Sequence, residues 1–290
     1  MTHRGPSFAS PTRPVIVDAP QALLDLSRAQ APHWPESDAA AGNAVRVTAT
    51  TAPDGNVRFT AGSYEAPDVV LPPGLLAANG LIGTVIGAFV AADADWICLH
   101  GAALAMGPGG QGGLTVLLGD TMAGKSTLAM ALTARGAKTG GARLWCDDRL
   151  PLSADAMGFA LGLCPKLRLP LPDSAPASFM NLVDGHETAR EGSMVYLGLG
   201  DRLQAVFGER LKVARLIVLA RSRQPQVPVL TGASVATTVK HLVPVTFAPH
   251  LDPMARLGRL RQLAEASECL HLSYGDSFAA AALLMKGADA

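Results

Sequence analysis

The segment GDTMAGKS at residues 119–126 decides the fold of this 290-residue chain. It fits the pattern G-x-x-x-x-G-K-[ST] at every fixed position, which is typical of a loop that binds nucleotide phosphates. Glycines let the backbone turn tightly, so that successive N–H groups point at phosphate oxygens. Lys125 is expected to reach the β- and γ-phosphates, and Ser126 to bind Mg²⁺. The residues expected to bind a nucleoside triphosphate are Gly119, Asp120, Thr121, Met122, Ala123, Gly124, Lys125, Ser126 and Thr127.

The residues on either side of this loop predict a nucleotide-binding unit. Residues 114–118 (LTVLL) form a short apolar, β-prone run that ends where the glycine turn begins. Residues 127–135 predict a helix that ends near Gly136 and points its positive N-terminal end at the anion. Residues 144–146 predict a buried strand that is followed at once by Asp147 and Asp148.

A second strand is expected just before the loop. Residues 96–105 predict one continuous strand, and the glycine-rich run 107–113 turns the chain back into strand 114–118. This hairpin would bring His100 near the phosphate loop, as a core or capping residue or as a functional one. The sheet is then either doubly wound or mixed, and the hairpin favours a mixed sheet.

Composition narrows the class of protein. Apolar residues make up 49% of the chain and charged residues 17%, which indicates an ordered globular protein. Lys+Arg and Asp+Glu each number 24, so bulk charge gives no reason to expect nucleic-acid or membrane-surface binding. The four cysteines (Cys98, Cys146, Cys164 and Cys269) lie far apart and are expected to be buried, reduced thiols.

Residues 75–92 carry no charge over 18 positions and admit two interpretations. They are short for a membrane span, contain Asn79, and lack flanking Lys or Arg. A buried helix is therefore expected, and with no apolar signal segment at the N-terminus we expect a cytoplasmic protein.

The chain divides by pattern into an N-terminal module, residues 1–95, and a larger domain, residues 96–290. Residues 22–29 predict a short helix. Residues 45–50 and 57–60 are β-prone and joined by a Pro-Asp-Gly-Asn turn, so a hairpin is expected. This module carries no recognisable chemistry, which leaves packing or substrate docking as its role.

The larger domain continues with a pair of cations and several regular elements. Alternation places Lys166 and Arg168 on one face of a strand, as a solvated surface or as a phosphate or substrate contact. The further elements expected are strands 215–221 and 269–274, helices 234–242 and 253–268, and a closing helix after residue 276.

The order His100-Gly101, glycine-containing hairpin, GDTMAGKS and Asp147-Asp148-Arg149 resembles the catalytic domain of HPr kinase/phosphorylase. The resemblance covers about residues 96–175. It implies an α/β phosphate-loop kinase core with the mixed sheet, flanked by helices, that the family shares with phosphoenolpyruvate carboxykinases. The N-terminal module would be a small β-containing addition to that core.

The resemblance also implies roles for individual residues. Asp148 would be the base that accepts the proton of a substrate serine. His100 would lie close to Asp148 and help to set the protonation state of that carboxylate. Lys125 would stabilise charge on the transferred phosphoryl group, and Asp147 would assist catalysis and join Ser126 in binding Mg²⁺. From the residues alone, Arg149 is either a phosphate contact or a structural partner of Asp147. A homo-oligomer is compatible with the resemblance, although no segment identifies an interface.

Two departures from the family pattern shape the expected substrate. Thr127 stands where the family usually has Glu after the loop serine, and the signature Glu-x-Arg-Gly-Leu-Gly is absent, its nearest counterpart being residues 166–173. These departures weigh against recognition of the HPr protein and against the reverse reaction. In size and organisation the chain more closely resembles the HPr-kinase-like enzymes that phosphorylate the C-terminal serine of lasso-peptide precursors. The cations Lys166 and Arg168 would suit such a terminal carboxylate.

Three functions therefore remain open from sequence. The first is an ATP-dependent kinase acting on a serine of a peptide or protein. The second is a kinase for a small hydroxylated metabolite such as free serine. The third is an ATP-binding regulatory module without phosphoryl transfer, against which the Asp147-Asp148 pair argues, since a pure sensor has no need of a base.

Overall fold

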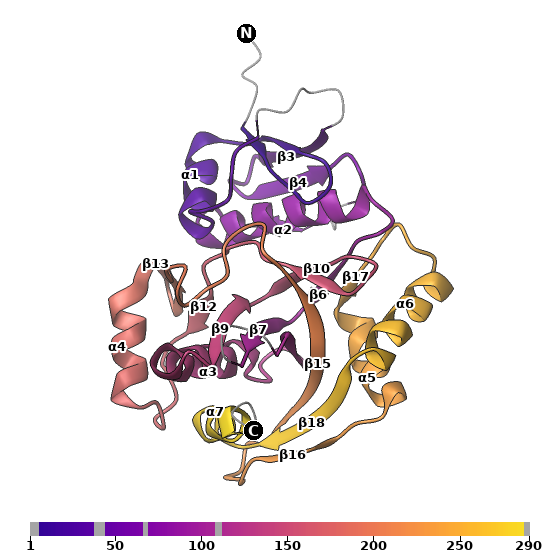
Figure 1. Ribbon diagram of the computed structural model, residues 1–290. Helices are drawn as coiled ribbons and strands as arrows, with labels where there is room; N and C mark the ends of the chain where they lie inside the picture. Colours follow the sequence, from indigo (N-terminus) through magenta and orange to yellow (C-terminus); the bar gives the residue numbers. More distant parts are fainter. Residues whose placement is uncertain (1–5, 38–43, 66–68, 108–111, 287–290) are drawn as a thin grey trace.

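The computed structural model describes residues 6–37, 44–65, 69–107 and 112–286. Figure 1 shows a small N-terminal unit, in indigo and purple, that rests on one end of a larger α/β unit. The larger unit holds a long mixed sheet with helices on both faces (Figure 1). This architecture confirms the expected mixed α/β fold.

The N-terminal unit is a sheet in the order β1-β2-β3-β4-β5, packed on two helices. The expected hairpin is present, because β3 and β4 pair in antiparallel register from Thr51↔Val57 to Val47↔Ala61. The elements are β1 (Ser7–Phe8), β2 (Val15–Asp18), α1 (Gln21–Gln30), β3 (Val45–Thr51), β4 (Val57–Ala61), β5 (Val70–Leu71) and α2 (Leu75–Ala91).

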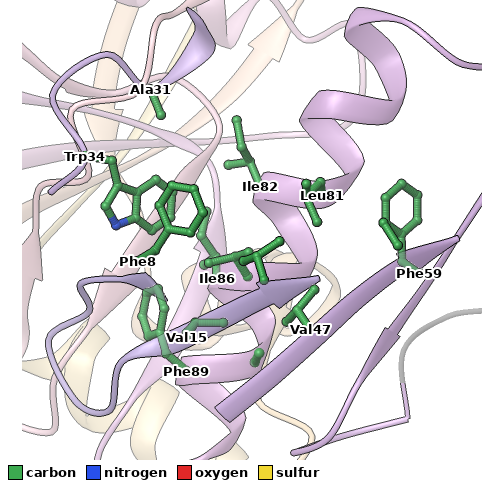
Figure 2. Close-up of a cluster of buried hydrophobic side chains, with 14 of the residues drawn as sticks. Phe8, Val15, Ala31, Trp34, Val47, Phe59, Leu81, Ile82, Ile86 and Phe89 are labelled. Carbon is green, nitrogen blue, oxygen red and sulfur yellow. The ribbon is translucent and has the colours of Figure 1, made fainter. Parts of the chain in front are cut away.

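Helix α2 is the charge-free segment of the sequence, and it is a buried helix as expected. Leu81, Ile86 and Phe89 are at most 1% exposed. Figure 2 shows these side chains gathered with Val15 and Val47 of the sheet. Within the described part of the chain, no helix has both the length and the apolar character needed to cross a membrane.

The core of the N-terminal unit continues into the larger unit. Trp96, Cys98, Phe159 and Leu161 belong to the same apolar cluster as α2. The two units therefore share a packed interface, and the division into domains 1–95 and 96–290 stays a prediction.

The large sheet runs in the order β17-β6-β10-β11-β15-β8-β7-β9, with β18 paired to β15 and β16 paired to β18. Its first half consists of β17 (Thr246–Phe247), β6 (Ile97–His100), β10 (Arg149–Leu152) and β11 (Met157–Phe159). Its second half consists of β15 (Arg210–Arg221), β8 (Leu114–Leu118), β7 (Ala102–Met106), β9 (Ala142–Cys146), β18 (Glu268–Tyr274) and β16 (Val229–Gly232).

Strand direction places the phosphate loop. Strands β8, β15 and β18 are parallel, and β9 runs the same way because both β8 and β9 are antiparallel to β7. The carboxyl ends of these four strands meet at one edge of the sheet, where open α/β sheets bind their ligands. That edge carries Gly119, Asp147, Arg221 and the end of β18 at Tyr274.

Side-chain alternation along the central strands divides the core into two layers. Leu117 of β8 and Ile217 of β15 pack with α3 and α7 on one face, whereas Val116 and Leu216 pack with α5 and α6 on the other. Figure 1 shows the two groups of helices on opposite sides of the sheet. The helices are α3 (Lys125–Thr139), α4 (Ala177–His186), α5 (Val235–Leu242), the short 3-10 helix η3 (Val243–Val245), α6 (Pro253–Glu265) and α7 (Ser277–Lys286).

A small separate sheet, β12-β14-β13, lies beside α4 (Figure 1). Its strands are β12 (Lys166–Arg168), β13 (Glu187–Glu191) and β14 (Met194–Leu197). The carboxylate of Glu191 accepts hydrogen bonds from the backbone N–H groups of Leu75 and Leu76, at 3.3 and 3.2 Å. This contact satisfies unpaired donors at the N-terminus of α2 and ties the small sheet to that helix.

The prediction of one strand over residues 96–105 was wrong. The chain turns at Gly101, so that β6 pairs with β10 and β17, while β7 pairs with β8 and β9. A Cβ at Gly101 would lie 2.9 Å from the Leu117 carbonyl oxygen, so only glycine lets the backbone pass this close. The returning strand β8 is antiparallel to β7 as expected, although residues 108–111 of the glycine-rich run lie outside the described residues.

The predicted end of α3 at Gly136 was also wrong. A Cβ there would lie 2.2 Å from the Ala142 carbonyl oxygen, so Gly136 permits close packing of the helix on β9. The helix instead ends at Thr139, and Gly140, with φ +72°, donates its N–H to the Gly136 carbonyl at 2.7 Å. Helix α6 likewise ends at Glu265, before the predicted residue 268, where β18 already begins.

The four cysteines are free thiols, as expected. Burial was predicted for all of them, but only Cys98 and Cys146 are buried, whereas Cys164 and Cys269 are partly exposed.

Candidate active site

The phosphate loop has the backbone conformation that its sequence predicts. Gly124 has φ +85° and Met122 has φ +68°, and α3 begins at Lys125. A Cβ at Gly124 would lie 2.9 Å from the Tyr274 hydroxyl, which donates a 2.5 Å hydrogen bond to the Ala123 carbonyl. The end of β18 therefore holds the loop in a fixed position at the start of a helix, where an anion is favoured.

Lys125 lies inside this loop and is 8% exposed. Its ammonium group donates to the carbonyls of Gly119 and Asp120, at 2.8 and 3.1 Å. Burial lowers the pKa of Lys125, and the carboxylates of Asp148, Asp147 and Asp120 oppose that shift. A phosphate group would bring further negative charge to this cation and favour its protonated form.

Asp147 follows β9 and is buried beside Ser126. Its Oδ2 accepts the backbone N–H of Lys166 at 3.0 Å, while its buried Oδ1 has no hydrogen-bond partner among the described residues. Burial raises the pKa of Asp147, and the nearby Ser126 hydroxyl lowers it by less. An orphaned, buried carboxylate oxygen is costly unless a cation or a proton completes its shell.

Ser126 and Asp147 fit a magnesium site in which the substrate supplies the remaining ligands. Across the described ranges, no group of three or more His, Cys, Asp or Glu side chains is placed to hold a metal ion. Mg²⁺ commonly takes one or two protein ligands, and phosphate and water oxygens supply the rest. Ser126 and Asp147 would hold such an ion, which neutralises phosphate charge when bound.

Asp148 lies next to three cationic or proton-bearing side chains. Its Oδ2 is 2.9 Å from Lys166 Nζ and 3.9 Å from Arg149 Nε, and its Oδ1 is 3.0 Å from His100 Nδ1. The Asp148 side chain is 19% exposed, so these charges interact with little solvent between them. The backbone contributes too, because Gly101 N–H donates to the Asp148 carbonyl at 3.1 Å.

This environment fixes the protonation state of Asp148. Burial acts to raise the pKa of Asp148, but Lys166, Arg149 and His100 outweigh it and lower the pKa to about 2. For His100, burial lowers the pKa, and Asp148 opposes the shift. At neutral pH the site therefore presents an ionised Asp148 beside a neutral imidazole.

The structure shows how far the expected site residues come together. His100, Lys125, Ser126, Asp147 and Asp148 all lie at the same edge of the sheet, although 48 residues separate the two ends of the set. Two further side chains, Arg149 and Lys166, contact Asp148 directly. The carboxylate contacted by Arg149 is thus Asp148, not Asp147.

Lys166 and Arg168 do not act as a pair. The alternation of β12 is as expected, with Leu167 buried at 2% exposure. However, the Lys166 ammonium is already paired with Asp148, and the exposed side chain of Arg168 has no hydrogen bond or ion pair with any residue that the structure describes. A shared contact of both cations with one substrate carboxylate has no support in this arrangement.

Sequence reasoning missed three residues that border the loop: Arg221, Tyr274 and Ser277. A Cβ at Gly124 would lie 3.5 Å from both Arg221 Cδ and Ser277 Oγ. Arg221 and Tyr274 end two parallel strands, β15 and β18, and Ser277 begins α7. The sequence holds one signal for Arg221 and Tyr274, which is that each ends an apolar strand. The carboxyl ends of parallel strands lie at the same edge of a sheet.

Comparison with known proteins adds little to this geometry. No protein-family model and no curated protein matches the sequence. A solved structure of the Hpr(Ser) kinase/phosphatase from Coxiella burnetii matches at 14% identity and a TM-score of 0.30, over 66% of this chain and 93% of that chain. A similarity this low establishes neither a family nor an activity, so the chemistry of the site rests on its own residues.

Proposed function

We propose that this protein is an ATP-dependent kinase that transfers the terminal phosphoryl group to the serine hydroxyl of a peptide or protein. The observation that carries the proposal is one edge of the sheet where a phosphate loop, an orphaned Asp147 oxygen and an ionised Asp148 meet. Phosphoryl transfer requires positioning, a metal and a correctly placed carboxylate more than covalent machinery. The phosphate loop would provide the positioning and Asp148 the carboxylate, and Ser126 and Asp147 would hold the metal.

The loop residues hold the nucleotide. Backbone N–H groups of residues 119–126 and the N-terminus of α3 surround the phosphates, and Lys125 moves from its loop carbonyls to the β- and γ-phosphate oxygens. Ser126 and Asp147 would hold Mg²⁺. The cofactors proposed are therefore ATP and Mg²⁺.

Asp148 orients the acceptor hydroxyl. In the transfer, the serine oxygen forms a bond to the γ-phosphorus while the bond from that phosphorus to the β–γ bridging oxygen breaks. The hydroxyl proton passes to Asp148 and then to solvent. A carboxylate with a pKa of about 2 is a weak base, so it accepts a hydrogen bond first and takes the proton late, as the new P–O bond forms.

The acceptor proposed is a peptide serine, with the C-terminal serine of a lasso-peptide precursor as one form of it. His100 and Arg149 flank Asp148 and would set its charge and orientation during transfer. The site is expected to operate in the cytoplasm, where ATP is available, and a homo-oligomer is compatible with it.

Intact-mass spectrometry of acceptors after incubation with the protein, ATP and Mg²⁺ tests this function. The acceptors are a serine-terminated precursor peptide, the HPr protein and free serine. We expect a gain of one phosphate on the peptide. Transfer to free serine alone would support a metabolite kinase in place of a peptide kinase. ATP binding without any transfer would support a regulatory module.

Two variants test the assigned roles. Asp148→Asn is expected to lower turnover by about 100-fold or more while ATP binding persists. Lys125→Ala is expected to lose both ATP binding and turnover. Asp201→Asn, at an exposed position away from the loop, is the matched control and should leave both unchanged. Unchanged turnover of Asp148→Asn would refute its role as the base.

A further inference from the structure

A groove of about 290 Å³ runs along α2, between the small N-terminal sheet and the edge of the large sheet. Its walls are mainly apolar. They include Phe59, Leu71 and Leu76 on the N-terminal side and Phe247 on the other. Leu76 is 46% exposed, so a large apolar side chain faces solvent at the rim.

One cation lies in this mainly apolar groove, whose lining also includes the polar residues Tyr64, Asn79 and Thr84. The guanidinium of Arg149 packs over Gly83, where a Cβ would lie only 2.5 Å from Nη2. Its Nε faces Asp148 at 3.9 Å. Within the described ranges, neither Nη atom has a hydrogen-bond or ion-pair partner, which leaves both free for a carboxylate of a ligand.

The groove adjoins the candidate active site across the side chain of Arg149. A smaller cavity of about 30 Å³, lined by Asp147, Asp148 and Lys166, shares two lining residues with the groove. These shared residues are Asn79 and Arg149. A ligand that contacts Arg149 in the groove would therefore lie one side chain away from Asp148, the carboxylate proposed to receive a serine proton.

The dimensions of the groove suit a peptide better than a free amino acid. Its lining residues on α2 extend from Leu76 to Gly87, about 16 Å at 1.5 Å per residue. An extended chain advances about 3.3 Å per residue, so roughly five residues cover that length. The groove also lies between β5 and β17, each the last strand of its sheet, and sheet edges leave backbone groups free to pair with an extended chain.

We propose that this groove binds the acceptor peptide of the proposed kinase. An apolar side chain of the peptide packs against Leu76 and its neighbours, and a carboxylate of the peptide pairs with Arg149. That carboxylate is either the chain terminus or an acidic side chain. The adjacent serine hydroxyl then reaches Asp148. The inference rests on the proposed function but assigns the recognition to α2 and Arg149 rather than to Lys166 and Arg168.

Binding of short labelled peptides, measured by fluorescence anisotropy with Mg²⁺ and ADP present, tests this proposal without requiring transfer. The peptides, of about six residues, carry a serine and scan Leu, Asp and Lys through the other positions. Each is made with a free and with an amidated C-terminus, so that a terminal carboxylate is distinguished from an acidic side chain. We expect preferential binding of peptides with one apolar residue and one carboxylate near the serine.

Variants locate the binding. Leu76→Gln is expected to raise the peptide Kd about fivefold, while Mg-ATP affinity stays unchanged. The matched control is Leu257→Gln, because Leu257 is 41% exposed on the distant helix α6. Arg149→Met is expected to abolish the preference for a carboxylate, and Arg149→Lys to restore part of it.

The outcomes separate this inference from the proposed function. Selective binding that depends on Leu76 and Arg149 supports the groove even when no phosphate is transferred. Transfer to a peptide whose affinity is unaffected by both substitutions overturns the groove and leaves the kinase standing. Absence of binding by every peptide also overturns it.

Discussion

Replacement of Lys166 by Met should destabilise the protein in a pH-dependent way, because it removes a close partner of Asp148. The Lys166 ammonium is 2.9 Å from Asp148 Oδ2, and the two side chains are 24% and 19% exposed. Removing one member of such a pair leaves the other charge partly buried and less well compensated.

The magnitude follows from the pKa of Asp148. That pKa falls from the ordinary value of 3.8 to about 2 in the folded protein, a difference of nearly two pH units. At about 1.36 kcal/mol per unit, the ionised Asp148 contributes about 2.4 kcal/mol to the free energy of unfolding at pH 7. Lys166 acts alongside Arg149 and His100, so its loss should remove about 1–2 kcal/mol of this.

The sign of the pH dependence is fixed by the direction of the shift. A lowered folded-state pKa stabilises the fold fully above pH 3.8, and this stabilisation is lost as the pH falls toward 2. The difference in stability between the natural protein and Lys166→Met should therefore be largest near pH 7. It should shrink to about half near pH 2.5, midway between the folded-state pKa values of Asp148 in the two proteins.

Urea unfolding followed by circular dichroism, at several pH values between about 7 and about 2.5, measures this difference. Lys212→Met, at an exposed position on β15, serves as the control and should change stability by less than about 0.5 kcal/mol. A loss of stability for Lys166→Met that is equal at about pH 7 and about pH 2.5 would refute the ion-pair explanation. A decrease of less than about 0.5 kcal/mol in the free energy of unfolding at pH 7 would refute the ion-pair explanation as well.

Two other substitutions probe the nucleotide site. Gly124→Ala places a side chain at φ +85° and 2.9 Å from the Tyr274 hydroxyl. We therefore expect urea unfolding to show a free energy of unfolding about 1–2 kcal/mol lower, and calorimetry to show ATP binding at least about tenfold weaker. Normal ATP affinity would contradict the described loop. Asp147→Asn should weaken the binding of Mg-ATP about tenfold or more, with little effect on the binding of metal-free ATP. If both were weakened equally, Asp147 would not be a ligand of the metal.

The elements around the phosphate loop were predictable because their signals are local. An apolar run, a glycine turn and a helix follow one another between residues 114 and 139, and the structure reproduces that order. The meeting of His100 with Asp148 was also anticipated, from the family resemblance and from the hairpin that leads into the loop.

The unpredicted features depend on contacts between distant parts of the chain. The break at Gly101 lies inside an apolar run, so no change of pattern marks it, and its cause is the close Leu117 carbonyl. The pairing of Lys166 with Asp148 required the small sheet to be placed against β9 and β10. The groove along α2 could not be read from sequence, because its lining residues extend from Phe59 to Phe247.

The small sheet β12-β14-β13 connects two sites that the chain keeps far apart in sequence. At one side it carries Lys166, which holds Asp148, and at the other it carries Glu191, which caps α2. Both residues pair across β14, with Tyr196 and Met194 respectively. The sheet therefore lies between the N-terminus of α2, at one wall of the groove, and the carboxylate of Asp148. A shift of α2 along its axis would move Glu191 and, through β14, Lys166, and the pKa of Asp148 would rise as the Lys166 ammonium moves away.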